Sequence, residues 1–291
     1  MYKEPSQISR ATIAVERLAK PEQAHKYAHG HALVLSGPAG KGGAARLAGR
    51  GALRIGAGLV TLGVPHAALA ENAAQLNAVM LAEIDDPGAL ARLLEDQRLN
   101  ALCLGPGLGH ERARALVPVA LAARRRCLLD ADALTAYMKN PAQLFEILHE
   151  KTILTPHGGE FARLFPDLAM REDQAGSIPQ RAKVEAVRAA AARAGCVVLL
   201  KGAQTVIAAP DGRAALHGAL GARAAPWLAT AGSGDVLAGF ITGLLARGFA
   251  PMQAGETGAW LHVECARAFG PGLIAEDLPE ALPRVFSDLG L

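Results

Sequence analysis

A glycine-rich turn carrying one carboxylate precedes a strongly apolar helix pattern. The stretch reads TAGSGDVLAG from Thr230 to Gly239, and Asp235 directly follows Gly234. Backbone N–H groups of such a turn, with the positive end of the following helix, can surround a phosphate. Asp235 could then accept the proton of an attacking hydroxyl. An acidic residue in a first helical turn is also an ordinary stabilising choice, but flexible glycines on both sides of one serine cost conformational entropy and favour the chemical interpretation.

Polar residues also follow other strand-like runs. In LLKGAQT, Lys201 can neutralise a nucleotide phosphate, or it can be a solvated lysine at a strand end. In LTPHGGE, His157 directly follows a strand and is a candidate ligand-binding residue, whereas Glu160 is as well explained by helix capping. LDADAL places Asp130 and Asp132 on one side of an extended segment. That pair suits contacts to magnesium-bound water or to a ribose, with turn formation as the alternative.

Several familiar motifs are absent. GPAGKGG lacks the spacing and the Ser/Thr of a P-loop, and GPGLG is not the dinucleotide fingerprint. AGSGD is not a nucleophile elbow, which argues against a serine hydrolase. His25, His29 and His31 have no cysteine or carboxylate at ligand spacing. We therefore expect no metal site built from protein ligands alone.

The elements that must position these residues alternate between strand and helix. Strand-like runs start at residues 31, 58, 78, 101, 127, 152 and 196. Several of them are continuously apolar, as expected for parallel strands covered on both faces. A Pro-Asp-Gly turn in TVIAAPDGRAALHGA predicts a hairpin, and helices are expected over 234–247, 251–269 and from Leu278. Ligands of such sheets bind beyond the carboxyl ends of the strands, where the polar residues above would form one concave site.

Composition bounds the class of protein. The net charge is +3 and basic residues are scattered apart from Arg124, Arg125 and Arg126, so no nucleic-acid partner is expected. Four unpaired cysteines favour buried, reduced thiols in a cytoplasmic protein. No signal-peptide pattern or membrane-length apolar run is present. We expect a polar N-terminal arm over residues 1–30 and one domain over 31–291.

The ordered set of motifs resembles one family. It comprises GGAARLAGRGALRIGAGLVTLGVP, LGPGLG, LDADAL, LTPHGGEFARLF, LLKGAQTVIA and LATAGSGDVLAGFITGLLARG, and it runs from about Ala32 to about Leu282. This set resembles the ADP/ATP-dependent NAD(P)H-hydrate dehydratases of the ribokinase-like superfamily. The resemblance implies an α/β fold, a three-layer sandwich whose mostly parallel central sheet is covered by helices on both faces. It implies repair of hydrated NADH or NADPH at the expense of ADP or ATP, with Mg²⁺.

The resemblance also implies residue roles. Asp235 would help the ring hydroxyl attack the terminal phosphoryl group, and loss of phosphate would restore the double bond. The residues expected against the hydrated cofactor are Ala44, Gly107, Gly109, His157 and Asp235. The residues expected at the adenine nucleotide are Lys201, Gly202, Ala203, Gln204, Thr205, Gly232, Ser233 and Gly234. A homo-oligomer, tetramer or dimer, is a further implication.

This chain departs from the family pattern at two places near the site. Ala224, Ala225, Pro226 and Trp227 stand where a Gly-Asn-Pro-Gly stretch is usual, and Gly158 replaces a proline. A tryptophan there would fill the site or reshape it. Two other functions therefore stay open: a small-molecule alcohol kinase of the same superfamily, and a nucleotide-binding protein without catalysis.

Overall fold

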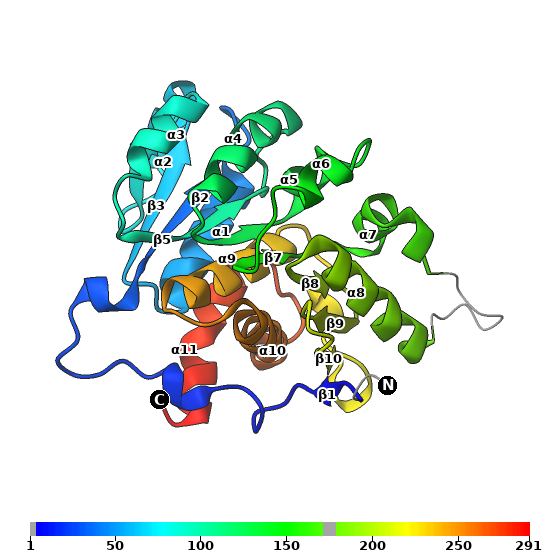
Figure 1. Ribbon diagram of the computed structural model, residues 1–291. Helices are drawn as coiled ribbons and strands as arrows, with labels where there is room; N and C mark the ends of the chain where they lie inside the picture. The colour runs from blue at the N-terminus through cyan, green and yellow to red at the C-terminus, as the bar shows by residue number, and fades with distance from the viewer. Residues whose placement is uncertain (1–3, 171–178) are drawn as a thin grey trace.

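A single mixed sheet forms the centre of the molecule. The computed structural model describes residues 4–170 and 179–291 (Figure 1). The strands of this part are β1 Ser6–Gln7, β2 His31–Leu35, β3 Leu59–Val64, β4 Met80–Glu83, β5 Leu99–Leu104, β6 Arg126–Leu129, β7 Thr152–Leu154, β8 Val197–Leu200, β9 Gln204–Ala208 and β10 Ala214–Gly218. Their order in the sheet is β1-β10-β9-β8-β7-β6-β5-β2-β3-β4. From β4 to β8 every pair is parallel, and β9 pairs antiparallel with both β8 and β10. The predicted sheet and hairpin are thereby confirmed.

Helices cover both faces of this sheet. They are α1 Gly43–Arg54, α2 Leu69–Ala73, α3 Pro87–Leu93, α4 His110–Ala122, α5 Ala131–Thr135, α6 Ala142–Phe145, α7 Gly158–Leu164, α8 Gln180–Ala194, α9 Ser233–Ala246, α10 Pro251–Phe269 and α11 Asp277–Leu289. Helices α1, α9, α10 and α11 contribute to one hydrophobic core, and α3, α4, α7 and α8 to the other. In Figure 1 the two groups lie on opposite sides of the strands. The fold is therefore the expected three-layer α/β sandwich.

Strand β2 illustrates why the strand sequences are continuously apolar. Val34 belongs to the core beneath α1 and α9, while its neighbours Leu33 and Leu35 belong to the core on the opposite face. All three side chains are at most 1% exposed. Because successive side chains of a strand point to opposite faces, a sheet covered on both sides requires apolar residues at every position.

The small residues of α9 allow this helix to pack tightly against α1. A Cβ atom added at Gly239 would lie 2.2 Å from the carbonyl oxygen of Ala48, and one added at Gly243 would lie 2.3 Å from Ile55 Cγ2. Almost every residue of α9 from Val236 onward is buried. The helix is thus held rigidly with only its first turn, which carries Asp235, facing the edge of the sheet.

The N-terminal segment packs on the domain. Strand β1 pairs with β10, and Ile8, Ile13 and Leu18 are buried in the same core as α9. The Arg247 guanidinium donates hydrogen bonds to the carbonyl oxygens of residues 17–19. The described part of the predicted polar arm, residues 4–30, is therefore attached to the domain by strand pairing, apolar burial and arginine contacts.

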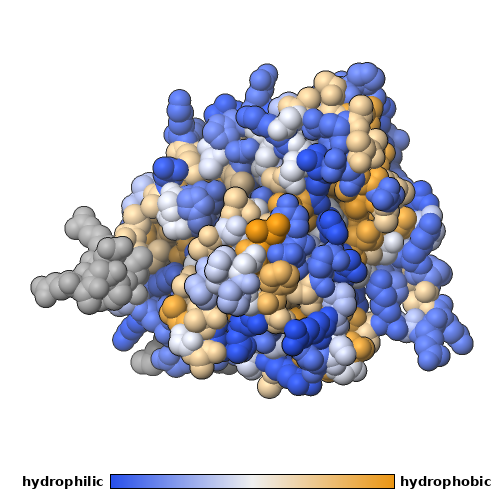
Figure 2. Space-filling view, turned by 180° about the vertical axis from the view of Figure 1, so that it is seen from behind, coloured by the Kyte–Doolittle hydropathy of each residue, from blue (hydrophilic) through white to orange (hydrophobic). Residues whose placement is uncertain are grey.

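The cysteines, the helix lengths and the surface hydropathy complete the description of the fold. All four cysteines are free and buried, and burial raises the pKa of the Cys103 thiol to about 12. None of the helices in the described ranges is long and apolar enough to cross a membrane. Figure 2 shows the back of the molecule, where hydrophilic residues predominate and hydrophobic ones gather toward the side of β3 and α2.

Candidate active site

A lysine–aspartate ion pair lies at the carboxyl ends of the parallel strands. Asp130 follows β6 and Lys201 follows β8, and Lys201 Nζ is 2.6 Å from Asp130 Oδ1. Asp130 is only 1% exposed, so the pair is shielded from water. Burial lowers the pKa of Lys201, but Asp130 more than offsets this and the pKa ends above its ordinary value. The lysine is therefore a fixed positive charge at this edge of the sheet.

Asp235 is the carboxylate with the most informative environment. Burial, and then the negative charge of Asp130, raise its pKa to about 6, while Lys201 opposes the shift. Burial also raises the pKa of Glu160. A carboxylate that titrates near neutrality is ionised at pH 7 yet remains basic enough to accept a proton, which is what general-base catalysis requires.

The turn before Asp235 is held from several directions. Gly232 adopts a left-handed conformation with φ of 86°, and Ser233 Oγ donates to the carbonyl oxygen of Leu228 at 2.8 Å. The buried His262 on α10 makes a 2.9 Å hydrogen bond from Nε2 to the carbonyl oxygen of Ser233. A Cβ atom at Gly234 would lie 3.6 Å from Lys201 Nζ. The start of α9, with its free N–H groups, thus faces a lysine, an arrangement suited to binding an anion.

His157 and Glu160 cap α7 reciprocally. His157 Nδ1 accepts from the N–H groups of Gly159 and Glu160, and Glu160 Oε2 accepts from the His157 N–H at 2.8 Å. Because Nδ1 is an acceptor, the proton of the neutral ring is on Nε2. His157 Nε2 lies 3.5 Å from Glu160 Oε1, and because the side chain of His157 is 56% exposed, the ring can still meet a ligand. Capping and ligand contact are therefore compatible at His157.

Two glycine-containing loops form the side of the site opposite β8. A Cβ atom at Gly107, whose φ is +63°, would lie 2.8 Å from the carbonyl oxygen of Lys41 and 3.4 Å from Ala44 Cβ. Asp132 accepts a 2.8 Å hydrogen bond from the N–H of Gly109. The structure therefore brings Ala44 against Gly107, and it gives Asp132 a loop-fixing contact.

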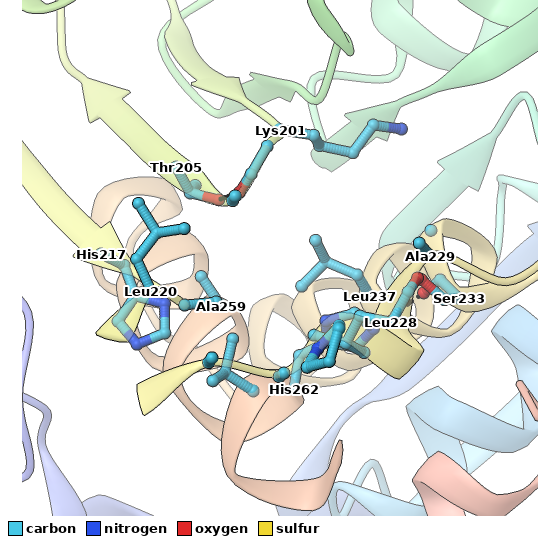
Figure 3. Close-up of a pocket in the computed structure, with 18 residues that line it drawn as sticks. Lys201, Thr205, His217, Leu220, Leu228, Ala229, Ser233, Leu237, Ala259 and His262 are labelled. Carbon is cyan, nitrogen blue, oxygen red and sulfur yellow. Dashed lines mark hydrogen bonds between the residues drawn. The ribbon is translucent and has the colours of Figure 1, made fainter. Parts of the chain in front are cut away.

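A cavity of about 490 Å³ opens beside Lys201 and the first turn of α9 (Figure 3). Of the residues expected at the nucleotide, those that line it are Lys201, Gly202, Ala203, Thr205, Ser233 and Gly234. Gln204 instead hydrogen-bonds Gln180 on α8. Gly232 packs beneath the turn, where an added Cβ would lie 2.6 Å from Leu47 Cδ1. Six of these eight residues thus face one cavity, and the other two support its walls.

The remaining wall of the cavity is mostly apolar, and apart from Ala224, Ala225 and Pro226 it was missed by sequence reasoning. Its residues are His217, Ala219, Leu220, Ala224, Ala225, Pro226, Leu228, Ala229, Leu237, Ala259, His262 and Val263. Burial lowers the pKa of both His217 and His262 to about 4, so both rings are neutral at pH 7. For the part of this wall on α10, the only sequence signal was the helical spacing of Ala259, His262 and Val263, which equally describes a core-facing stripe.

Trp227 lies outside this cavity. It lines a separate hollow of about 310 Å³ and is 48% exposed. The tryptophan therefore leaves the nucleotide-sized cavity open. The expectation that Trp227 would either fill or reshape the site is therefore narrowed, because its side chain does not fill the cavity.

Protein ligands do not form a closed metal site here. Among the described residues no cluster of three or more His, Cys, Asp or Glu could hold an ion. Mg²⁺ is commonly bound by one or two carboxylates together with substrate phosphates and water. Asp130, already at the site edge, fits that incomplete donor set.

The sheet order and the covering helices define a ribokinase-like fold, with the glycine–aspartate turn of α9 and a cavity at one edge of its sheet. A ribokinase-like protein from Enterococcus faecalis has the same fold, with a TM-score of 0.78 at 21% identity over 99% of this chain and 98% of that one. The family model for NAD(P)H-hydrate dehydratase matches residues 32–283. The chain therefore belongs to the NAD(P)H-hydrate dehydratase family.

Individual relatives are similar over most of this chain. An ADP-dependent (S)-NAD(P)H-hydrate dehydratase of Neisseria meningitidis is 33% identical over 279 residues, 90% of this chain and 87% of that protein. A bifunctional NAD(P)H-hydrate repair enzyme of Gloeobacter violaceus is 36% identical over 84% of this chain, but over only 46% of that protein. The chain spans about half the length of such bifunctional relatives. The structure of the ADP/ATP-dependent NAD(P)H-hydrate dehydratase of Bacillus subtilis, co-crystallised with ATP/Mg²⁺, has a TM-score of 0.76 at 28% identity, covering 98% of this chain and 99% of that one.

Proposed function

We propose that this protein converts (S)-NAD(P)H-hydrate to NAD(P)H at the expense of ADP or ATP. The ring hydroxyl oxygen attacks the terminal phosphorus of the nucleotide, and the bond to the leaving AMP or ADP breaks. The phosphorylated carbon then loses inorganic phosphate, and the adjacent C–H bond supplies the electron pair of the restored double bond as its proton leaves. Phosphate leaves far more readily than hydroxide, which is why a dehydration would consume a nucleotide.

The observation that carries this proposal is the environment of Asp235, whose pKa is raised by burial and then by Asp130 and Asp132 and is lowered by Lys201. Lys201 lines the proposed nucleotide cavity, and Asp132 accepts the N–H of Gly109 in the loop proposed for the hydrated cofactor, so Asp235 lies near the boundary of the two. A base with a pKa of about 6 at this boundary can take the hydroxyl proton while the start of α9 stabilises the transferring phosphoryl group.

The nucleotide half is supported by its shape and charge. An apolar cavity with neutral His217 and His262 suits an uncharged base, and Lys201 with the N–H groups of α9 suits the phosphates. Bound Mg²⁺ would neutralise phosphate charge; Asp130 Oδ1 is held by Lys201, so only its other carboxylate oxygen could serve the ion. The Neisseria and Bacillus relatives, named for ADP and for ADP or ATP, support the same co-substrates.

The decisive experiment is recovery of 340 nm absorbance from hydrated NADH and hydrated NADPH, each with ADP and with ATP in magnesium. We expect nucleotide-dependent recovery with one phosphate released per reduced cofactor formed. A stable phosphorylated product without recovery would instead indicate an alcohol kinase. Nucleotide binding without either product would indicate a binding protein that has lost catalysis.

We also propose a cytoplasmic homo-oligomer. A cytoplasmic location is supported by the proposed substrate, because reduced nicotinamide cofactors are intracellular. Strand β4 is an edge strand of the sheet with Met80 41% exposed, and hydrophobic residues gather on this side of the molecule (Figure 2). Light scattering of the purified chain would test the assembly.

A further inference from the structure

A short turn separates two hollows beside the start of α9. The 3₁₀ turn Pro226–Leu228 contributes Leu228 to the nucleotide cavity and Trp227 to the neighbouring hollow of about 310 Å³. Thr230 lines this second hollow from the same loop, and Leu273 and Ile274 line it from the segment before α11. The proposed reaction has two substrates that meet at Asp235. The second hollow next to the same turn is therefore a candidate binding place for part of the second substrate.

The second hollow lies near the side of the site that carries Ala44. A Cβ atom added at Gly232 would lie 2.6 Å from Leu47 Cδ1 of α1 and 2.9 Å from Ala275 Cβ, the residue after Ile274. Leu47 lies three residues beyond Ala44 on α1, about 4.5 Å along the helix. The hollow is therefore a close neighbour of the helix that carries Ala44, on the side where the second base of a dinucleotide would lie if its reacting ring rested at Ala44 and Gly107.

We propose that Trp227 forms a stacking subsite for the adenine ring of the hydrated dinucleotide. The inference rests on the proposed function, because that substrate carries two bases and only one of them reacts. An exposed indole offers a flat apolar face on which any base can stack. The half-exposed Ile274 provides an apolar contact across the hollow, and Thr230 provides a hydroxyl near the ribose or the ring edge.

The hollow fits one base better than a larger partner. Its volume is at the small end of ligand sites, and buried Leu273 forms a fixed wall. The family pattern has glycine where this chain has Trp227, so the subsite would be a property of this chain and not of the reaction itself. The chemistry at Asp235 should proceed without it.

The test compares Trp227→Ala and Trp227→Phe on two substrates. Hydrated NADH carries the adenine, whereas hydrated reduced nicotinamide mononucleotide lacks it. We expect Trp227→Ala to raise KM for hydrated NADH about tenfold, which corresponds to about 1.4 kcal/mol, with kcat within about twofold. Trp227→Phe should retain most of the affinity. Kinetics with the truncated substrate and the KM for ADP should be unchanged. Equal effects on both substrates, or none on either, would overturn the proposal.

A binding measurement separates this proposal from the proposed function. Calorimetric titration with hydrated NADH, with the nucleotide cavity saturated by a non-hydrolysable ATP analogue, reports the subsite even if the chain has no turnover. Weaker binding by Trp227→Ala than by wild type supports the subsite, and equal binding rejects it. Light scattering of both proteins tests a competing explanation. If Trp227→Ala dissociates an oligomer without a change in affinity, the proposal is rejected and the tryptophan contacts a second copy of the chain instead.

Discussion

The two halves of the site differ in what lines them: side chains line one half, and backbone lines most of the other. The nucleotide half is a cavity walled by side chains, including Leu220, Leu237 and His262. The half proposed for the hydrated cofactor consists mainly of backbone, with Gly107 and Gly109 in left-handed conformations and Ala44 packed beside them. The first half should therefore respond to removal of side-chain atoms, and the second to addition of a single methyl group. In the proposed reaction Asp235 acts on both substrates, so its substitution should have the largest effect of all.

Asp235→Asn should have the largest effect. The amide keeps the shape of the side chain but cannot accept the hydroxyl proton, so we expect kcat to fall by about 10²–10⁴-fold. Nucleotide affinity should stay within a few-fold, as measured by calorimetry with ADP. The surface substitution Asp288→Asn is the matched control and should be neutral. A near-normal rate in Asp235→Asn would exclude the base role.

Gly107→Ala should damage the cofactor half selectively. The added Cβ would lie 2.8 Å from the Lys41 carbonyl oxygen, at a φ of +63° that disfavours alanine. The displaced loop would then disturb Ala44, and we expect kcat/KM for hydrated NADH to fall by more than about tenfold, while the KM for ADP changes little. Gly248→Ala is the control, since its φ is +92° but no atom lies within 4 Å of the added Cβ. If both variants lost the same activity, backbone strain and not the local contact would be responsible.

The two halves also differ in how much of them could be predicted from the sequence. Backbone motifs were visible because glycines and charged residues at strand ends are unusual, which is how Asp235, Lys201 and Gly107 were found. The apolar wall was invisible, because Leu237 and His262 occupy helix positions that look like ordinary core. Lys201 and Asp130 were each predicted as candidates, but their 2.6 Å contact joins residues 71 positions apart. Strand β1, two exposed polar residues, owes its pairing to β10 and carries no local signal of its own.

His262 should support the first turn of α9 from the side of the nucleotide cavity, and its loss should lower kcat. Its Nε2 group donates to the Ser233 carbonyl oxygen, so His262→Leu removes a support of the anion-binding turn. We expect kcat to drop about tenfold, the effect of losing roughly 1–1.5 kcal/mol of hydrogen bonding. His262→Gln can place an amide donor at a similar position and should recover most of the rate.

The control for His262 is His149→Leu, which removes another buried imidazole remote from the site. That variant should lower thermal stability while kcat stays unchanged. If His262→Gln were as impaired as His262→Leu, the hydrogen bond to Ser233 would not be what matters.

The last effect concerns the stability of the fold and not the rate, and it follows from the raised pKa of Asp235. Its folded-state pKa of about 6 exceeds the ordinary value of 3.8, so the folded protein binds this proton more tightly than the unfolded chain. Stability is therefore lost as pH rises from about 4 to about 6 and stays lost above that range. Asp235→Asn, which has no charge to bury, should be more stable than wild type by about 3 kcal/mol at pH 8. The difference should shrink toward pH 4 in urea unfolding. If Asp235→Asn were less stable than wild type at pH 8, the positive charge of Lys201 would stabilise the ionised Asp235 by more than its burial costs. Removing the buried charge would then not stabilise the fold.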